Sequence, residues 1–148
     1  MNYSIIYPCL CLALAIGGCK SQKLPATFSD LEGRWKIVEL NGNKLLPEET
    51  TQHLIFDTTT RRLSGNAGCN QISGNITHSH TQANNIKFQG VISTRKACLD
   101  MRMEDEFLKA LDRVARFDAE SQEAEKKTMT FYDADHQKLF VIQHITKE

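Results

Sequence analysis

Residues 65–74 read GNAGCNQISG, and the interpretation of this stretch decides how the chain around it folds. Glycine is needed where the backbone takes a positive φ or approaches another segment closely, and asparagine suits turns because its side chain bonds nearby backbone groups. The stretch matches neither the G-x-G-x-x-G pattern nor a Walker A loop, since no lysine-serine pair follows it. It therefore predicts a tight structural corner rather than a phosphate-binding loop.

Cys69 lies inside this corner and raises the question of catalysis. A cysteine nucleophile needs a neighbouring base or a positive environment to form its thiolate. The chain offers 5 histidines as candidate bases, but no local signature of a cysteine peptidase surrounds Cys69. We therefore expect no catalytic residue in the chain.

Short strands are predicted on both sides of the corner. Alternating or β-branched and aromatic patterns bounded by turn residues favour strands at 35–40, 53–57, 62–65, 70–76, 85–88, 127–132 and 138–142. The segment 133–136 between the last two strands has the composition of a hairpin turn. Because parallel pairs need long crossovers, strands joined by turns must pair antiparallel.

The period of the sequence changes at residue 100, where DMRMEDEFLKALDRVARF begins. Its apolar residues recur at spacings of three and four, at Met103, Phe107, Leu111, Val114 and Ala115, with Leu108 beside them. Acidic residues precede basic ones along the segment, which matches the helix dipole. We therefore expect an α+β fold: a curved antiparallel sheet or partial β-barrel of about seven to eight short strands with one amphipathic helix.

The N-terminus predicts export. Residues 5–16 are almost entirely apolar, but the run is too short for a permanent membrane span and is followed by small residues, as in a signal peptide. Ile16-Gly17-Gly18-Cys19 resembles the bacterial lipobox, which implies cleavage before Cys19 and lipid on its sulfur. No Lys or Arg precedes the apolar run, so an ordinary cleaved signal with a free Cys19, or a mis-called start codon, is the alternative.

The lipobox resemblance divides the chain into a lipoprotein signal peptide at 1–18, a lipidated tether at 19–27 and a folded domain at 28–148. Two or three acyl chains give stable anchoring, since each buried methylene contributes roughly 0.8 kcal/mol. The residue after Cys19 is Lys20. Lipoproteins retained at the inner membrane of enterobacteria carry an aspartate at this position. The expected location is therefore the cell envelope, with the protein lipid-anchored in the outer membrane and facing the periplasm.

Charge limits the range of partners. The chain has 18 basic and 18 acidic residues and no basic tract, so no nucleic acid is expected to bind. We expect a monomer that contacts the membrane through its lipid anchor, and an unknown envelope protein partner stays open.

The expected export signal determines which cysteines remain free to form a disulfide. Cys9 and Cys11 leave with the signal peptide and Cys19 takes the lipid, so Cys69 and Cys98 remain. Two cysteines in an oxidising compartment predict a disulfide, and a loop of about 30 residues would contribute roughly 3–4 kcal/mol in the chain-entropy model. Two buried free thiols are the alternative.

Short motifs occur in a fixed order along the chain. They are the Gly-x-Trp of Gly33 and Trp35, Asn41-Gly42, GNAGCN followed by Gly74, the Thr-x-x-x-Cys at 94–98, Glu106-Phe107 with Leu111, and the last hairpin. With these motifs the chain resembles META-domain proteins, the HslJ-like family of small bacterial envelope proteins, over roughly residues 28–145. The resemblance implies a fold and an envelope address without an established activity. It marks as family positions Gly33, Trp35, Gly65, Gly68, Cys69, Asn70, Gly74, Thr94 and Cys98.

Metal and cofactor sites are not expected. His78 and His80 would share a strand face and could ligate zinc, but the surrounding segment is polar and no third ligand is indicated. Asp133 and Asp135 lack the glycine and distal glutamate of a calcium loop. Trp35, the single tryptophan, is expected in the core rather than in a binding groove.

These observations favour a non-enzymatic, lipid-anchored envelope lipoprotein with a binding or structural role in envelope integrity or stress tolerance. One alternative is a small-ligand binder or enzyme with a site at the open end of the sheet. Converging histidines and acids in a pocket would favour that alternative, and a filled interior would count against it. Another is an inhibitor-type module that captures a partner, which an exposed apolar patch would support.

Overall fold

The computed structural model describes residues 26–46, 50–121 and 127–146. The expected signal peptide and Cys19 lie outside these residues. None of the helices in the described part has the length and apolar character needed to cross a bilayer. The elements in chain order are η1 (Phe28–Leu31), β1 (Gly33–Leu40), β2 (Asn43–Lys44), β3 (His53–Asp57), β4 (Arg62–Asn66), β5 (Gln71–His78), β6 (Ile86–Ser93), α1 (Arg102–Arg113), β7 (Arg116–Ser121), β8 (Thr128–Tyr132) and β9 (Lys138–His144).

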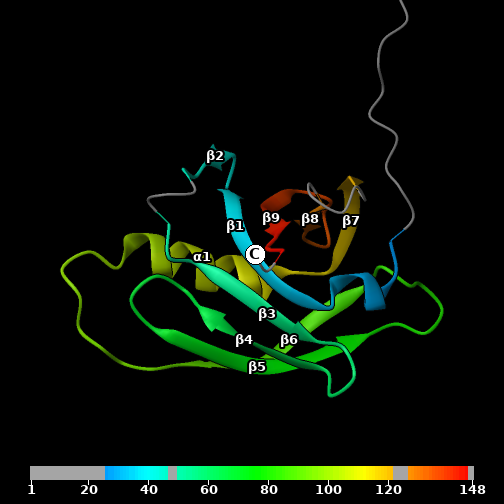
Figure 1. Ribbon diagram of the computed structural model, residues 1–148, viewed down its shortest axis with the longest axis horizontal. Helices are drawn as coiled ribbons and strands as arrows, with labels where there is room; N and C mark the ends of the chain where they lie inside the picture. The colour runs from blue at the N-terminus through cyan, green and yellow to red at the C-terminus, as the bar shows by residue number, and fades with distance from the viewer. Residues whose placement is uncertain (1–25, 47–49, 122–126, 147–148) are drawn as a thin grey trace, which may run out of the picture.

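The strands form one curled antiparallel sheet in the order β6-β5-β4-β3-β1-β9-β8-β7, with β2 paired to the end of β1. Figure 1 shows the curl, with β4 to β6 on one side and β7 to β9 on the other. The two edge strands meet near their first residues, at an Asn85–Arg116 bridge, and α1 packs against β6. The predicted class, α+β with a partial barrel and one helix, is confirmed.

The interior of the curl is filled by aromatic rings. Phe131 lies at the centre, with its ring centroid 4.6 Å from that of Phe140, 5.9 Å from Phe117 and 6.2 Å from Phe56. Phe107 of α1 meets Phe140 edge-on, with 5.6 Å between centroids. Stacked and edge-on pairs of this kind stabilise a core beyond their buried area. The helix therefore closes the interior with its own aromatic side chain.

Trp35 belongs to the core, as expected. Its side chain is fully buried, and its indole Nε1–H donates to the Leu31 carbonyl at 2.7 Å. Lys127 Nζ lies 5.7 Å from the Trp35 ring centroid and donates to the Asp30 carbonyl at 2.7 Å. These contacts hold η1 against the start of β1 and the entry to β8.

The helix prediction was wrong at its C-terminal end. Helix α1 ends at Arg113, and Val114 takes an extended conformation with φ −57° and ψ 129°. The next residues form β7, because Arg116 and Phe117 pair with Tyr132 and Phe131 of β8. The helical spacing of the apolar residues had concealed this strand.

The buried face of the helix also differs from the expected one. Met103 is 44% exposed, whereas its neighbour Glu104 is only 3% exposed. The buried residues of α1 are Glu104, Phe107, Ala110 and Leu111. The buried face of α1 therefore includes Glu104 in place of Met103. From the sequence, Glu104 was expected only to complement the helix dipole.

The predicted turn at 133–136 is confirmed. Strands β8 and β9 pair antiparallel, and the turn between them is held by one carboxylate. Asp133 Oδ1 accepts hydrogen bonds from the backbone N–H groups of Asp135 (3.0 Å) and Gln137 (2.9 Å). His136 has φ +63°, a left-handed conformation that is uncommon outside glycine.

Candidate functional site

The corner at 65–74 is tied to the segment that enters α1 by a disulfide. Cys69 and Cys98 are bonded, with 6.4 Å between their Cα atoms, which is within the usual range. The predicted pair is therefore present, and the structure does not hold the two free thiols of the alternative. A cysteine bonded in this way has no thiolate with which to attack a substrate.

Glu104 holds the corner from inside. Its Oε2 accepts hydrogen bonds from the backbone N–H groups of Cys69 (2.9 Å) and Asn70 (2.8 Å), and its Oε1 accepts one from Asn70 Nδ2 (2.7 Å). Asn70 Oδ1 in turn accepts from Thr94 Oγ1 and the Lys96 backbone N–H, both at 2.8 Å. The amides that a phosphate would need are therefore already bound to a carboxylate of the protein.

Glycine is required at one position of the corner by close backbone contact. A Cβ at Gly65 would lie 2.1 Å from the His53 carbonyl oxygen on the neighbouring strand. This distance is too short for any side chain, so Gly65 allows β3 and β4 to pair. The interpretation of the stretch as a structural corner agrees with this geometry.

His78 and His80 lie side by side, with 4.9 Å between their ring centroids. The His78 ring stacks on Phe28 at 4.2 Å and 8°, and burial lowers its pKa, with the positive charge of Arg61 acting in the same direction. Within the described ranges, no three His, Cys, Asp or Glu residues gather closely enough to hold a metal ion. His78 packs against Phe28 of η1, and His80 packs against His78.

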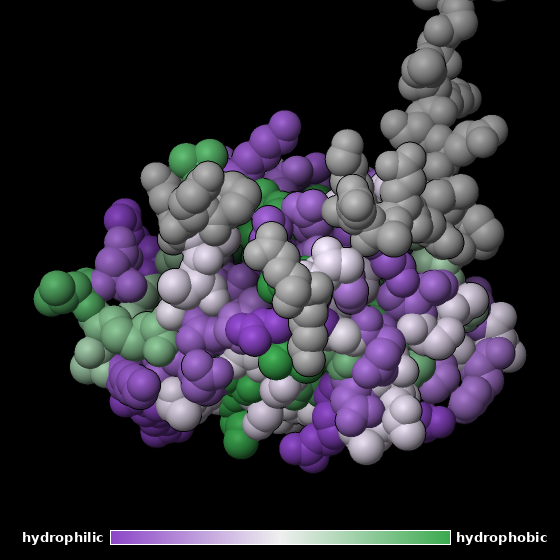
Figure 2. Space-filling model, viewed as in Figure 1, coloured by the Kyte–Doolittle hydropathy of each residue, from purple (hydrophilic) through white to green (hydrophobic). Residues whose placement is uncertain are grey.

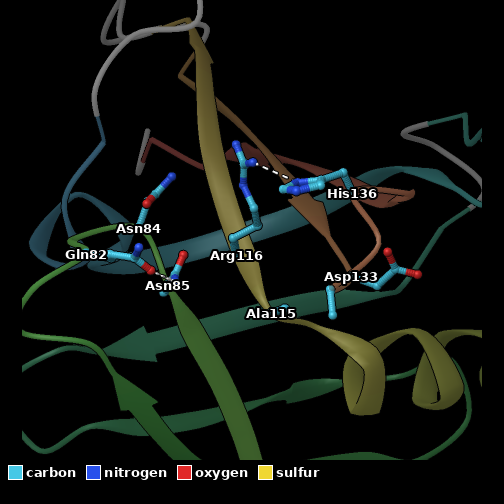
Figure 3. A pocket seen from close by; sticks show the side chains of 8 residues that line it. Gln82, Asn84, Asn85, Ala115, Arg116, Asp133 and His136 are labelled. Carbon is cyan, nitrogen blue, oxygen red and sulfur yellow. Dashed lines mark hydrogen bonds between the residues drawn. The ribbon is translucent and has the colours of Figure 1, made fainter.

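A polar cleft of about 520 Å³ opens where the two edge strands meet, and we call it the seam cleft. The loop between β5 and β6, the start of β7 and the turn between β8 and β9 all contribute to it (Figure 3). Backbone bonds fix the seam: Ile86 N–H donates to the Ala115 carbonyl at 3.1 Å, and Phe117 N–H to the Asn84 carbonyl at 3.0 Å. The residues lining the cleft are Gln82, Asn84, Asn85, Ala115, Arg116, Asp133, Ala134 and His136.

Arg116 is the central side chain of the seam cleft. Its Nη2 pairs with the buried carboxylate of Asp118, and its Nη1 donates to His136 Nδ1 at 3.0 Å. The guanidinium carbon lies 5.3 Å from the centre of the Tyr132 ring. Asn84 Nδ2 donates to the other Asp118 oxygen at 3.0 Å. The guanidinium is thus held on several sides, as Figure 3 shows for its contact with His136.

The Asp133 carboxylate, which lines the seam cleft, is held by hydrogen bonds within its own turn. Asp133 has a lowered pKa, mainly because the Gln137 N–H bonds its carboxylate, with Arg113 adding to the effect. His136 faces the Arg116 guanidinium through Nδ1, so it is not paired with a carboxylate through that nitrogen. The cleft therefore brings His136 and Asp133 into one lining, with His136 Nδ1 facing the Arg116 guanidinium rather than a carboxylate.

Much of this site could not be predicted from the sequence. The sequence predicts Arg116 in the helix, His136 in a turn and Asn85 at the start of a strand, whereas residues 82–84 belong to the polar segment that follows His80. Glu104 resembled the other acids of the first helical turn. Glu104, Asn84 and His136 have no local pattern that would reveal these partners, since the partners lie 20 to 35 residues away.

A few large apolar side chains are exposed on the surface of the domain. Figure 2 shows a largely hydrophilic face with separate hydrophobic spots. The large apolar residues exposed in the described chain are Leu46, Ile92, Leu99 and Met103. Leu46 and Met103 line one cleft together with Leu45, whereas Ile92 and Leu99 lie outside its lining.

Solved structures share the fold. An NMR structure of a protein from Burkholderia xenovorans aligns with a TM-score of 0.65 at 18% identity, covering 99% of this chain and 97% of that one. A second NMR structure gives 0.55 at 17% identity, with coverage of 80% and 95%. A crystal structure of a duf4847 family protein from Bacteroides vulgatus gives 0.52 at 13%, with coverage of 80% and 96%.

The comparison with curated proteins gives no match. The comparison with protein families gives one that spans nearly all of the described domain, because the META domain model matches residues 28–144. That range contains the corner, the disulfide, the helix and the closing hairpin. The chain therefore belongs to the META domain family.

Proposed function

We propose that this protein is an exported, non-enzymatic META-domain lipoprotein, anchored through Cys19 in the outer membrane and facing the periplasm. Its role is binding or structural support in envelope integrity or stress tolerance. The observation that carries the proposal is the Cys69–Cys98 disulfide. Disulfides persist in oxidising compartments and are rare in the cytosol, so this bond supports export.

The packed interior supports the non-enzymatic part of the proposal. Small-molecule sites of enzymes are commonly concave and enclosed, and in barrels they often lie in the mouth. Here the rings of Phe131, Phe140 and Phe107 fill the curl and its helix-covered side. Arg116 and Asp133 near the surface are held by ion pairs and hydrogen bonds within the fold.

Substitution of Cys19→Ala tests the anchor. The native protein is expected in the membrane fraction and to incorporate radiolabelled palmitate. Cys19→Ala is expected to lose the label and to leave the membrane fraction. The matched control is Cys11→Ala, which removes a cysteine from the expected signal peptide and should change neither property. Retention of the label by Cys19→Ala would contradict the lipoprotein proposal.

A further inference from the structure

The seam cleft is neutral in charge. The Arg116 guanidinium is balanced by the buried carboxylate of Asp118, and the Asp133 carboxylate by Arg113. Gln82, Asn84 and Asn85 add uncharged amides. A strongly anionic or cationic ligand would meet no uncompensated charge here, so the lining favours a neutral ligand.

The lining also offers both kinds of hydrogen-bonding group. Asn84 Nδ2 donates to Asp118, which leaves its Oδ1 as an acceptor. Gln82 Oε1 accepts from Asn85 Nδ2, which leaves the Gln82 amide nitrogen as a donor. Arginine can only donate hydrogen bonds, so His136 Nδ1 is the acceptor in its contact with Arg116. In the neutral imidazole the proton is then on Nε2, which can donate to a ligand.

These groups are held in place before a ligand arrives. Arg116 is fixed by Asp118, His136 and the Tyr132 ring, and Asn84 is fixed by Asp118. Their backbones belong to the seam between the two edge strands. A site that is ordered in advance loses less entropy when it binds.

We propose that the seam cleft binds a neutral, hydroxyl-rich ligand of the saccharide class. Each sugar hydroxyl both donates and accepts, which matches the mixed lining of amides, guanidinium and imidazole. The volume of about 520 Å³ is in the range of small-molecule sites. Figure 3 shows Gln82, Asn84 and Asn85 on one side of Arg116 and His136 on the other, so a short saccharide would contact both sides.

The inference specifies the binding part of the proposed function but depends only on the folded domain. If the cleft fails to bind saccharides, the anchor at Cys19 is unaffected. If Cys19 carries no lipid, the cleft keeps its lining. The two tests therefore fail separately.

The experiment is an NMR titration of the exported full chain carrying Cys19→Ala, purified with its disulfide intact. The probes are maltose and N,N′-diacetylchitobiose, with sodium acetate as the anionic comparison. We expect at least one disaccharide to cause saturable amide shifts in the seam cleft, with a Kd on the order of 1 mM. Absence of saturable shifts with both disaccharides, or saturation by acetate alone, would overturn the proposal.

Three variants locate the binding. Gln82→Ala removes an exposed amide of the cleft, and His136→Asn removes the imidazole while keeping a residue that tolerates a positive φ. Each is expected to weaken disaccharide binding roughly fivefold, as expected for one lost hydrogen bond. Gln89→Ala, an exposed glutamine on β6 outside the cleft lining, is the matched control and should bind as the parent chain does. Unchanged binding by both cleft variants would overturn the assignment of the site.

Discussion

Glu104 shows how one residue gives the corner its shape. Its buried carboxylate accepts three N–H bonds from Cys69 and Asn70, and no basic side chain pairs with it among the described residues. Backbone donors satisfy a buried carboxylate in the same way that they satisfy a bound anion. The loop that resembled a phosphate cradle in sequence thus holds an internal anion contributed by the helix.

Replacing this carboxylate by an amide should be costly. In Glu104→Gln the new NH₂ group would face N–H donors instead of accepting from them. Hydrogen bonds to charged groups contribute roughly 1.5–3 kcal/mol, so we expect the free energy of unfolding to fall by about 2–4 kcal/mol. Urea denaturation of the disulfide-bonded protein measures this change.

The matched control for Glu104→Gln is Glu106→Gln, an exposed position two residues along the same helix. Surface substitutions of this kind usually change stability by less than about 0.5 kcal/mol. If the two variants unfold at the same urea concentration, Glu104 does not hold the corner.

At the scale of elements, the strands with local turn signals were the predictable ones. Strand β3 was predicted at the residues where it occurs, and the turn around Asp133 was recognised from its composition. Strand β7 was missed because Val114 and Ala115 continue the helical spacing, while its strand pairing depends on β8. The phase of the helix was misjudged because Met103 is apolar and Glu104 is charged, yet tertiary hydrogen bonds decide which one is buried.

The turn between β8 and β9 should make stability depend on acid pH. The pKa of Asp133 lies below its ordinary value of 3.8, so the native state binds this proton less readily than the unfolded state. Its stabilising contribution is fully present above the unfolded pKa and is lost as the pH falls through the folded pKa. We expect Asp133→Asn to lower the thermal midpoint at neutral pH, with the difference from native shrinking below pH 3.8.

Thermal unfolding followed by circular dichroism across this acid range measures the effect. Asp135→Asn is the control, because Asp135 is exposed in the same turn and contributes its backbone N–H to the Asp133 carboxylate. A constant difference between Asp133→Asn and native protein from neutral to strongly acid pH would contradict the role assigned to Asp133.

At the scale of the molecule, motif order was sufficient to indicate the family and the class of fold. The sheet curls until Asn85 meets Arg116, and this contact forms the seam cleft. Nothing near either residue in the sequence indicates that contact, since it results from the summed twist and register of eight paired strands. The corner was therefore predictable in part, whereas the cleft required the assembled sheet.

The central claim is that this META domain is exported, oxidised and held at the membrane by lipid on Cys19. Intact mass spectrometry of protein extracted from membranes, with and without reduction, tests it most directly. We expect a chain that begins at Cys19, carries acyl groups there and gains two hydrogens on reduction as the Cys69–Cys98 bond opens. A chain that still carries residues 1–18, or one that begins elsewhere without lipid, would contradict it.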